Sequence, residues 1–104
     1  MDWKSHVAIV TGAGSGIGTG IAEVFAEQGA QVIVAEVSEE RGRAVAADLQ
    51  QRFGRGLFIQ TDVSSADGCK ALVEETLENC GHIDTLVNNA GVNFVKPTLE
   101  MDEE

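Results

Sequence analysis

The residues with the clearest chemical potential are the glycines of positions 11–18, which read Thr-Gly-Ala-Gly-Ser-Gly-Ile-Gly. They follow the apolar run 7–10 and come just before a helical pattern. Loop glycines let the backbone approach an anion, and the first N–H groups of a helix point at it with the positive end of the helix dipole. The segment therefore predicts a phosphate-binding loop. Its spacing is G-x-x-x-G-x-G, and a turn that only packs the helix on the strand is the alternative interpretation.

A carboxylate follows the second apolar run of the chain. Glu36 comes directly after the run 31–35, eighteen residues beyond Gly18. An acid at this place can accept hydrogen bonds from the hydroxyls of an adenosine ribose, and it repels a 2′-phosphate. Neither position 37 nor position 38 holds Lys or Arg, although Arg41 and Arg43 are near. These residues favour NAD over NADP, and the alternative is a solvated surface carboxylate.

Polar groups also follow the third and fourth apolar runs. Asp62 and Val63 come after the run 57–60. Because ligands of open α/β sheets bind at the carboxyl ends of the strands, this carboxylate could accept from an adenine amino group, with the Val63 backbone assisting. A turn residue or a helix cap explains Asp62 equally well. The segment 88–91, Asn-Asn-Ala-Gly, suits a crevice in which the backbone approaches a flat ligand, and a polar turn is the alternative.

Apolar runs and helical patterns alternate along the chain, and these elements would have to position the polar residues. Strands are predicted at 6–11, 31–35, 57–60 and 85–88, and helices at 16–28, 39–53 and 66–80. Such alternation is typical of βαβ units around a parallel sheet. The sequence therefore predicts an α/β fold. It is a partial, Rossmann-like doubly wound parallel sheet of about four strands in the order 3-2-1-4, with three helices.

Each predicted helix has an apolar face that should pack on the sheet, and Gly29 and Gly81 should end the first and third helices. The three faces comprise Ile17, Ile21, Val24 and Phe25, then Val45, Ala46, Leu49 and Phe53, then Cys69, Leu72, Val73, Thr76, Leu77 and Cys80. The two cysteines are about 16 Å apart along the third helix, which is too far for a disulfide. We expect two buried thiols in a reduced compartment.

The overall composition limits the partners of the protein. A net charge of −10 disfavours nucleic acid and anionic membranes, since phosphate contacts need clustered Lys and Arg. No stretch is long enough to cross a bilayer, and the first residues lack the basic region and apolar run of a signal peptide. We therefore expect a cytoplasmic protein with no membrane partner. Neither His6 nor His82 has a partner at metal-ligand spacing, so no metal site is predicted.

Three motifs, at 11–18, 62–63 and 88–91, together resemble those of the short-chain dehydrogenase/reductase family, and the resemblance covers essentially the whole chain. It implies that the first motif binds the cofactor pyrophosphate, Glu36 the ribose, and the second motif the adenine. Asn88 would brace the fourth strand against the glycine loop, and Ala90 and Gly91 would border the nicotinamide. The cofactor-binding residues implied in this way are Thr11, Gly12, Ser15, Gly16, Ile17, Gly18, Glu36, Asp62, Val63, Asn89, Ala90 and Gly91.

The chain contains no tyrosine. In the family that it resembles, a tyrosine hydroxyl exchanges a proton with the substrate oxygen, a lysine and a serine assist, and these residues lie beyond the fourth strand. No catalytic residue is therefore assigned. Residues 97–99 are typical of a turn, and residues 102–104 of the first turn of another helix. We expect residues 1–104 to be a single dinucleotide-binding domain, truncated before the catalytic half and inactive alone.

The resemblance also implies the function of the complete protein. It predicts an NAD-dependent oxidoreductase that acts on a small alcohol or ketone and forms a homo-oligomer, with NADP as the second choice of cofactor. A non-catalytic dinucleotide-binding module or an inactive remnant is the alternative. An NTPase is disfavoured, because no Gly-Lys-Ser/Thr sequence ends the loop to hold a triphosphate and magnesium.

Overall fold

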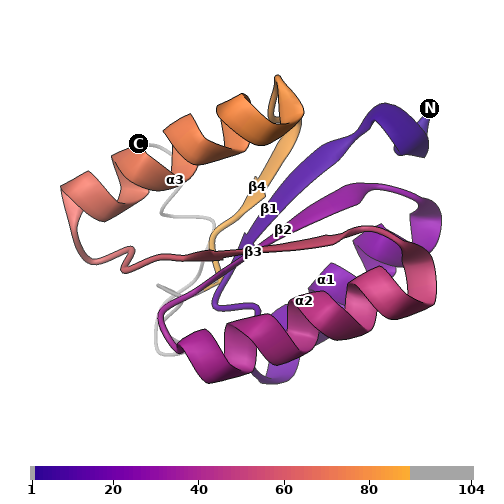
Figure 1. Cartoon of the computed structure of the whole chain (residues 1–104), viewed down its shortest axis with the longest axis horizontal. Coiled ribbons are helices and arrows are strands. Elements are labelled where there is room, and N and C mark those ends of the chain that lie inside the picture. The colour runs from indigo at the N-terminus through magenta and orange to yellow at the C-terminus, as the bar shows by residue number, and fades with distance from the viewer. Residues whose placement is uncertain (1, 90–104) are drawn as a thin grey trace, which may run out of the picture.

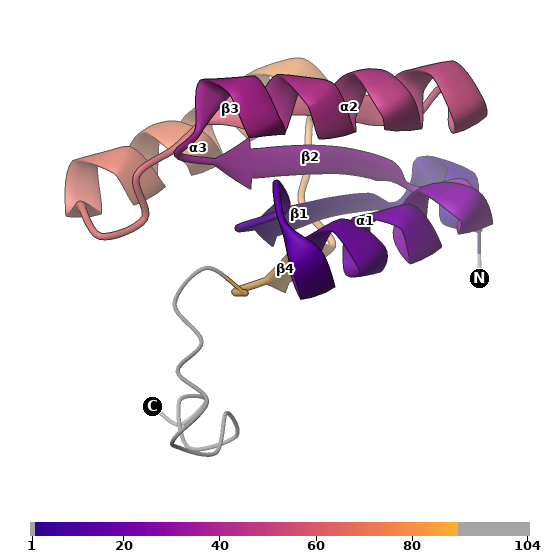
Figure 2. The same ribbon diagram turned by 90° about the horizontal axis from the view of Figure 1, so that it is seen from below.

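A computed structural model describes residues 2–89, and within them four parallel strands form one sheet. The strands are β1 (Val7–Thr11), β2 (Gln31–Glu36), β3 (Gly56–Gln60) and β4 (Thr85–Val87), in the order β3-β2-β1-β4. The helices are the short 3-10 helix η1 (Trp3–Ser5), α1 (Gly16–Gln28), α2 (Glu39–Phe53) and α3 (Ala66–Cys80). Helices α1 and α2 cover one face of the sheet and α3 covers the other (Figures 1 and 2). The predicted doubly wound α/β fold and its strand order are confirmed.

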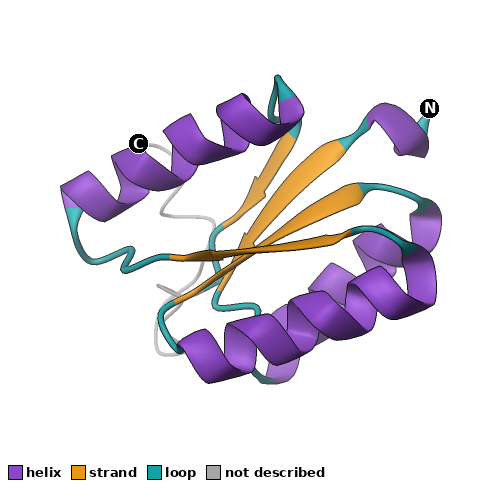
Figure 3. Cartoon of the chain, in the orientation of Figure 1, coloured by secondary structure: helices purple, strands orange, loops and turns teal. Residues whose placement is uncertain are grey.

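The three α-helices begin and end where the sequence predicts, because residues that interrupt helices flank them. Ser38 and Ser65 cap α2 and α3 by accepting hydrogen bonds from the first turn of each helix. Gly29 and Gly81 follow α1 and α3 with φ angles of 108° and 87°, in the left-handed region that favours glycine. Each strand differs from its predicted bounds by one residue at one end. The loops that leave the strands are shown in Figure 3.

The central strands β1 and β2 are almost entirely buried, because helices cover both faces of a doubly wound sheet. The core beneath α1 and α2 is formed by Val10, Ala13, Ala22, Ala26, Val32, Val34, Ala46 and Leu49. The core beneath α3 is formed by Val7, Ile9, Ile33, Ala35, Ile59 and Leu72. The predicted face of α2 is confirmed, since its four residues are buried or pack against the first of these clusters.

The predicted inner face of α1 is partly wrong. Ile17 and Val24 are 60% and 59% exposed, and the buried residues of the helix are instead Gly18, Ala22 and Ala26. These small residues recur every four positions, so they share one side of the helix and let it lie close to the sheet. The larger apolar side chains are consequently displaced toward the outer side. The other two members of the predicted face are half-buried.

The predicted inner face of α3 is also partly wrong. Leu72 is buried, but Val73 and Leu77 are 40% and 44% exposed. Cys69 is exposed, so the expectation of two buried thiols is wrong for this residue. Cys80 is half-buried, and burial raises the pKa of its thiol. Among the described residues α3 is the one α-helix on its face of the sheet (Figure 1). Within residues 2–89, no neighbouring helix on that face covers Val73 and Leu77, which are partly exposed.

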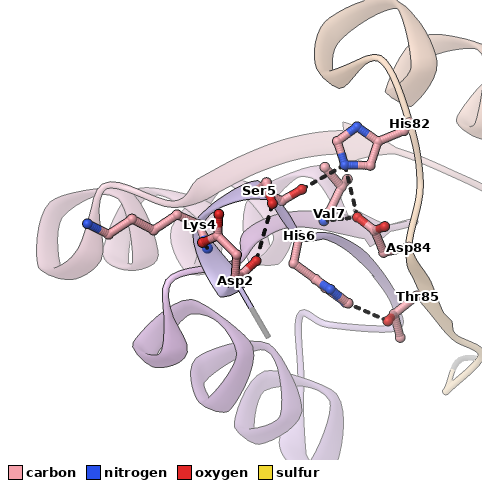
Figure 4. A network of polar contacts seen from close by, with 8 residues as sticks. All are labelled: Asp2, Lys4, Ser5, His6, Val7, His82, Asp84 and Thr85. Carbon is pink, nitrogen blue, oxygen red and sulfur yellow. Dashed lines mark hydrogen bonds and ion pairs between the residues drawn. The ribbon is translucent and has the colours of Figure 1, made fainter.

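Helix η1, which sequence periodicity does not predict, is joined to the start of β4 by a polar network (Figure 4). Asp84 Oδ2 accepts a hydrogen bond of 2.7 Å from the Val7 backbone N–H and lies 2.9 Å from His82 Nε2. The same imidazole nitrogen donates to the Ser5 carbonyl at 2.7 Å. The Val7 N–H is the largest of the influences that hold the pKa of Asp84 below its usual range.

Some expectations concern the ends of the chain or the absence of a feature. Ala90, Gly91, the predicted turn at 97–99 and the predicted helix start at 102–104 lie outside the described residues. Among residues 2–89, no helix is long and apolar enough to span a bilayer. Within the same range, no group of three or more His, Cys, Asp and Glu side chains is arranged to hold a metal ion.

Candidate functional site

A cavity of about 210 Å³ lies at the carboxyl ends of β1, β2 and β3. This is the edge of an open α/β sheet at which ligands bind. Four of the residues predicted for the cofactor line the cavity together, although they come from three separate segments of the chain. They are Gly12, Glu36, Asp62 and Val63, and the remaining lining residues are Ala35, Val37, Thr61 and Ser64.

The glycine loop between β1 and α1 is shaped by close backbone contacts. A Cβ atom on Gly18 would lie 2.2 Å from the Gly12 carbonyl oxygen, so only glycine lets α1 start this close to the loop. Gly18 therefore has the packing role that was the alternative interpretation of these glycines. Gly16 differs, because it has a φ of +51° and a Cβ there would meet nothing within 4 Å. The loop thus combines one tightly packed glycine with one that faces open space.

The first turn of α1 lacks the cap that the other two α-helices have. Ser15 is the N-cap residue of α1, yet its exposed side chain makes no capping hydrogen bond. Ser38 and Ser65 do make such bonds in α2 and α3. The N–H groups at the start of a helix are unsatisfied unless a side chain, water or ligand accepts from them. At α1 no side chain of the described residues accepts from them, although the Gly18 N–H donates to the Ser15 carbonyl at 3.1 Å. The absence of a side-chain cap is compatible with the anion site predicted for the loop.

Glu36 connects two segments at the wall of the cavity. Its Oε1 accepts a hydrogen bond from the Gly14 N–H at 2.9 Å, and its Oε2 accepts from the Ser38 N–H at 3.0 Å. The residue is only 7% exposed. The alternative of a solvated surface carboxylate is therefore wrong. A carboxylate has about four lone-pair positions, so each oxygen keeps capacity to accept from a ligand hydroxyl.

Asp62 also lines the cavity, and it forms a turn. Its Oδ1 accepts from the Ser64 side chain at 2.6 Å and from the Ser64 backbone N–H at 3.0 Å. These two hydrogen bonds, the side-chain one first, lower the pKa of Asp62. The turn role is thus observed, whereas the cap of α3 is Ser65. Contact of Asp62 with adenine stays a prediction, supported by its place in the lining.

The two asparagines after β4 hold this strand against the glycine loop. The Thr11 hydroxyl, at the end of β1, donates to the Val87 carbonyl at 3.2 Å and to Asn88 Oδ1 at 3.4 Å. Asn89 Nδ2 donates to the Gly12 carbonyl at 3.2 Å. The arrangement agrees with the bracing role predicted for Asn88. It adds the same role for Asn89, whose predicted contact with the cofactor stays a prediction.

Two residues of this site were not singled out from the sequence. The Thr19 hydroxyl donates to the Ala13 carbonyl at 2.7 Å and so fixes the loop from within the first turn of α1. A hydroxyl residue directly after the glycines was the signal that could have revealed it. Ser64, which holds Asp62, could have been found from the turn-forming sequence after β3. Neither contact follows from helical or strand periodicity.

Comparison with known proteins identifies the fold family. The family model described as short chain dehydrogenase matches residues 6–104. The chain belongs to the short-chain dehydrogenase family. Its curated relatives include an uncharacterized oxidoreductase of Thermotoga maritima, which is 45% identical over 93% of the chain, and the short chain dehydrogenase/reductase astE of Aspergillus oryzae, 47% identical over 97%. The chain spans 38% and 40% of the lengths of these two relatives.

Solved structures of short-chain dehydrogenases share the same architecture. L-sorbose reductase from Gluconobacter frateurii, complexed with NADPH and L-sorbose, has a TM-score of 0.82 and 37% identity over 99% of the chain and 40% of that protein. A short chain dehydrogenase/reductase from Burkholderia phymatum in complex with NAD has a TM-score of 0.78 and 31% identity over 83% of the chain and 31% of that protein. Similar folds thus hold either nicotinamide dinucleotide.

Proposed function

We propose that the described part of the chain is the NAD-binding part of an oxidoreductase. In the complete protein it would support hydride transfer between the cofactor and a small alcohol or ketone. The observation that carries the proposal is the buried carboxylate of Glu36 in the wall of a cavity that also contains Gly12 of the glycine loop. Family membership supplies the chemical class, because the redox chemistry belongs to the nicotinamide and the protein binds and orients it.

The residues present fit a dinucleotide. The open position at Gly16 and the uncapped start of α1 suit a pyrophosphate, which backbone N–H groups would bind. Glu36 would accept from the adenosine ribose hydroxyls, while Asp62 and Val63 would border the adenine. Ser15 and Ile17, both exposed beside the loop, would lie against the bound phosphates. These assignments propose a nicotinamide dinucleotide as the ligand of the observed cavity.

The choice of NAD over NADP rests on Glu36. The related structures contain NAD in one case and NADPH in another, so the family alone does not decide. A fixed carboxylate at the ribose would repel a 2′-phosphate, since two like unit charges 4 Å apart cost about 4 kcal/mol near a protein surface. Moreover, the residues that line the described cavity include no Lys or Arg to compensate.

The 104-residue sequence has no tyrosine, so we further propose that this chain binds the cofactor without turning over an alcohol. Positioning of the cofactor supplies only part of catalysis when no general acid acts on the substrate. The second candidate function is a non-catalytic dinucleotide-binding module. Sequencing the gene beyond position 104 distinguishes the enzyme from the non-catalytic module, because a downstream Tyr-x-x-x-Lys segment would support the enzyme. The complete enzyme is expected to be a homo-oligomer.

Isothermal titration calorimetry on the folded chain tests the proposal. We expect measurable heat of binding with NAD and weaker binding with NADP. Replacement of Glu36 by alanine should lower the ratio of NAD to NADP affinity. The ribose assignment is wrong if this ratio does not change, and the whole proposal is wrong if the folded wild-type chain binds neither nucleotide.

A further inference from the structure

We propose that Gly14 is a positioning residue for cofactor specificity, because it provides both the space and the N–H group that hold Glu36 at the cavity wall. The inference rests on the proposed function and deepens it. Gly14 is not among the residues implied by the family resemblance, which leaves position 14 variable. Its role comes from a pair of contacts that this chain makes between the glycine loop and the end of β2.

The attractive half of this arrangement is a bridge across two loops. The Gly14 N–H donates to Glu36 Oε1, and the Ser38 N–H donates to Glu36 Oε2. Hydrogen bonds to an ionised carboxylate are stronger than neutral ones. Because each oxygen is held by a different segment, the carboxylate cannot rotate freely. The lone pairs that remain are therefore presented to the cavity in a fixed direction.

The steric half is the absence of a side chain at position 14. A Cβ atom there would lie 2.7 Å from Glu36 Oε1 and 2.8 Å from Glu36 Cδ, closer than such atoms are found in proteins. It would also lie 2.9 Å from Arg41 Cβ in α2. The carboxylate is the end of a flexible side chain and can move away, whereas Arg41 Cβ is attached to the backbone of α2 and yields only if α2 or the loop shifts. Any residue larger than glycine therefore displaces Glu36 from its two donors.

Backbone strain does not explain this glycine. The glycines with positive φ angles in the described chain are Gly12, Gly16, Gly29, Gly54 and Gly81, and position 14 is not one of them. Alanine can adopt its backbone conformation, so the substitution tests space alone. The chain also provides a matched control, because Gly20 in α1 has no positive φ and an added Cβ would meet nothing within 4 Å.

A double-mutant cycle tests the inference, with Kd values for NAD and NADP measured by calorimetry on the full chain. We expect Gly14→Ala to weaken NAD binding about tenfold, the effect of losing one hydrogen bond to a charged group. NADP binding should change less. Glu36→Asp shortens the side chain by one methylene and withdraws the carboxylate. In that background Gly14→Ala should cost less than about threefold, because the shorter side chain no longer places its carboxylate against the added methyl group; any cost of the Arg41 contact is common to both backgrounds and cancels in the coupling energy of the cycle.

Amide hydrogen exchange measured by NMR gives a readout that does not depend on the cofactor. The Gly14 amide should be protected in the wild type and lose protection in Glu36→Asp. Gly20→Ala should match the wild type in both measurements. If Gly14→Ala does not fold, folding of the Gly14→Ala/Glu36→Asp pair still supports the proposed clash.

The possible results separate the two proposals. Strictly additive effects in the cycle, or wild-type NAD affinity in a folded Gly14→Ala variant, would overturn the role of Gly14 and leave the proposed function intact. Failure of the wild-type chain to bind either nucleotide would overturn the proposed function and the specificity role together. In that case an unprotected Gly14 amide would also refute the bridge to Glu36.

Discussion

The paired substitutions Gly18→Ala and Gly20→Ala test how the glycine loop is packed. Both glycines lie in α1, but a Cβ on Gly18 would approach the Gly12 carbonyl oxygen to 2.2 Å and Asn89 Nδ2 to 2.7 Å, whereas one on Gly20 would meet nothing within 4 Å. The two variants share the gain in helix propensity from alanine. Their difference therefore isolates the close contact between helix and loop.

The expected magnitudes have opposite signs. Gly20→Ala should stabilise the fold by about 1 kcal/mol, the propensity of alanine over glycine in a helix. Gly18→Ala gains the same amount, but it also overpacks the contact with the loop at a cost of about 3 kcal/mol. This value is the upper end of the usual range for overpacking, because the Gly12 carbonyl oxygen is a backbone atom and cannot move aside easily. The variant also loses the Asn89–Gly12 hydrogen bond, worth about 1 kcal/mol. The net destabilisation is about 3 kcal/mol, which lowers the melting temperature by roughly 12–24 °C.

Urea unfolding followed by circular dichroism measures both free energies. The fluorescence of Trp3, the one tryptophan of the chain, gives a second probe from η1, and coincident transitions would justify a two-state treatment. Equal slopes against urea show that the variants differ in stability and not in the area that unfolding exposes. The close approach of α1 to the loop would be refuted if Gly18→Ala were as stable as Gly20→Ala.

Three other substitutions test separate parts of the structure. Glu36→Gln removes the charge that repels a 2′-phosphate, so the ratio of NADP to NAD affinity should rise at least about tenfold in calorimetry; an unchanged ratio would contradict the electrostatic argument. The pKa of Asp84 is lowered on folding, chiefly by the Val7 N–H, so its contribution to stability is present above the ordinary carboxyl pKa and is lost as the pH falls through the lowered one. Asp84→Asn should therefore reduce the fall in the urea midpoint between pH 7 and about pH 3, and an equal fall in both proteins would count against it. Gly42→Ala places a Cβ 2.0 Å from the Phe58 ring, and we expect a net loss of about 1–2 kcal/mol in urea unfolding, from overpacking less the helix gain; a stabilised variant would show that the ring moves freely.

The limits of sequence reasoning in this chain follow from the range of each interaction. Helix ends were predictable because Ser38, Ser65, Gly29 and Gly81 act on their own neighbours. The directions of the apolar faces of α1 and α3 were less predictable, because periodicity shows that a stripe exists but not which neighbour covers it. Val24 belongs to such a stripe and is nevertheless 59% exposed, since small residues bring α1 closer on its other side.

In the candidate site, too, some features were predictable from the sequence and others were not. Its members were predictable, because the carboxyl ends of parallel strands meet at one edge of the sheet, and Gly12, Glu36 and Asp62 do line one cavity. Their hydrogen-bond partners were not predictable. The contact between Gly14 and Glu36 joins positions 22 residues apart and depends on one side-chain conformation. No local pattern in the sequence encodes it.

The charge of the chain explains why backbone groups have this importance. A protein with a net charge of −10 repels an anionic dinucleotide at long range. Binding of the proposed cofactor would therefore depend on short-range donors, and the described cavity has no Lys or Arg in its lining. In the proposed function, the start of α1 would supply N–H groups without adding positive side chains, whereas Glu36 would add a negative charge that favours a ligand with free ribose hydroxyls over one with a 2′-phosphate. In this proposal, backbone N–H groups attract the cofactor and the Glu36 carboxylate discriminates between NAD and NADP. Gly14 belongs to the glycine loop and also holds the Glu36 carboxylate through its N–H group.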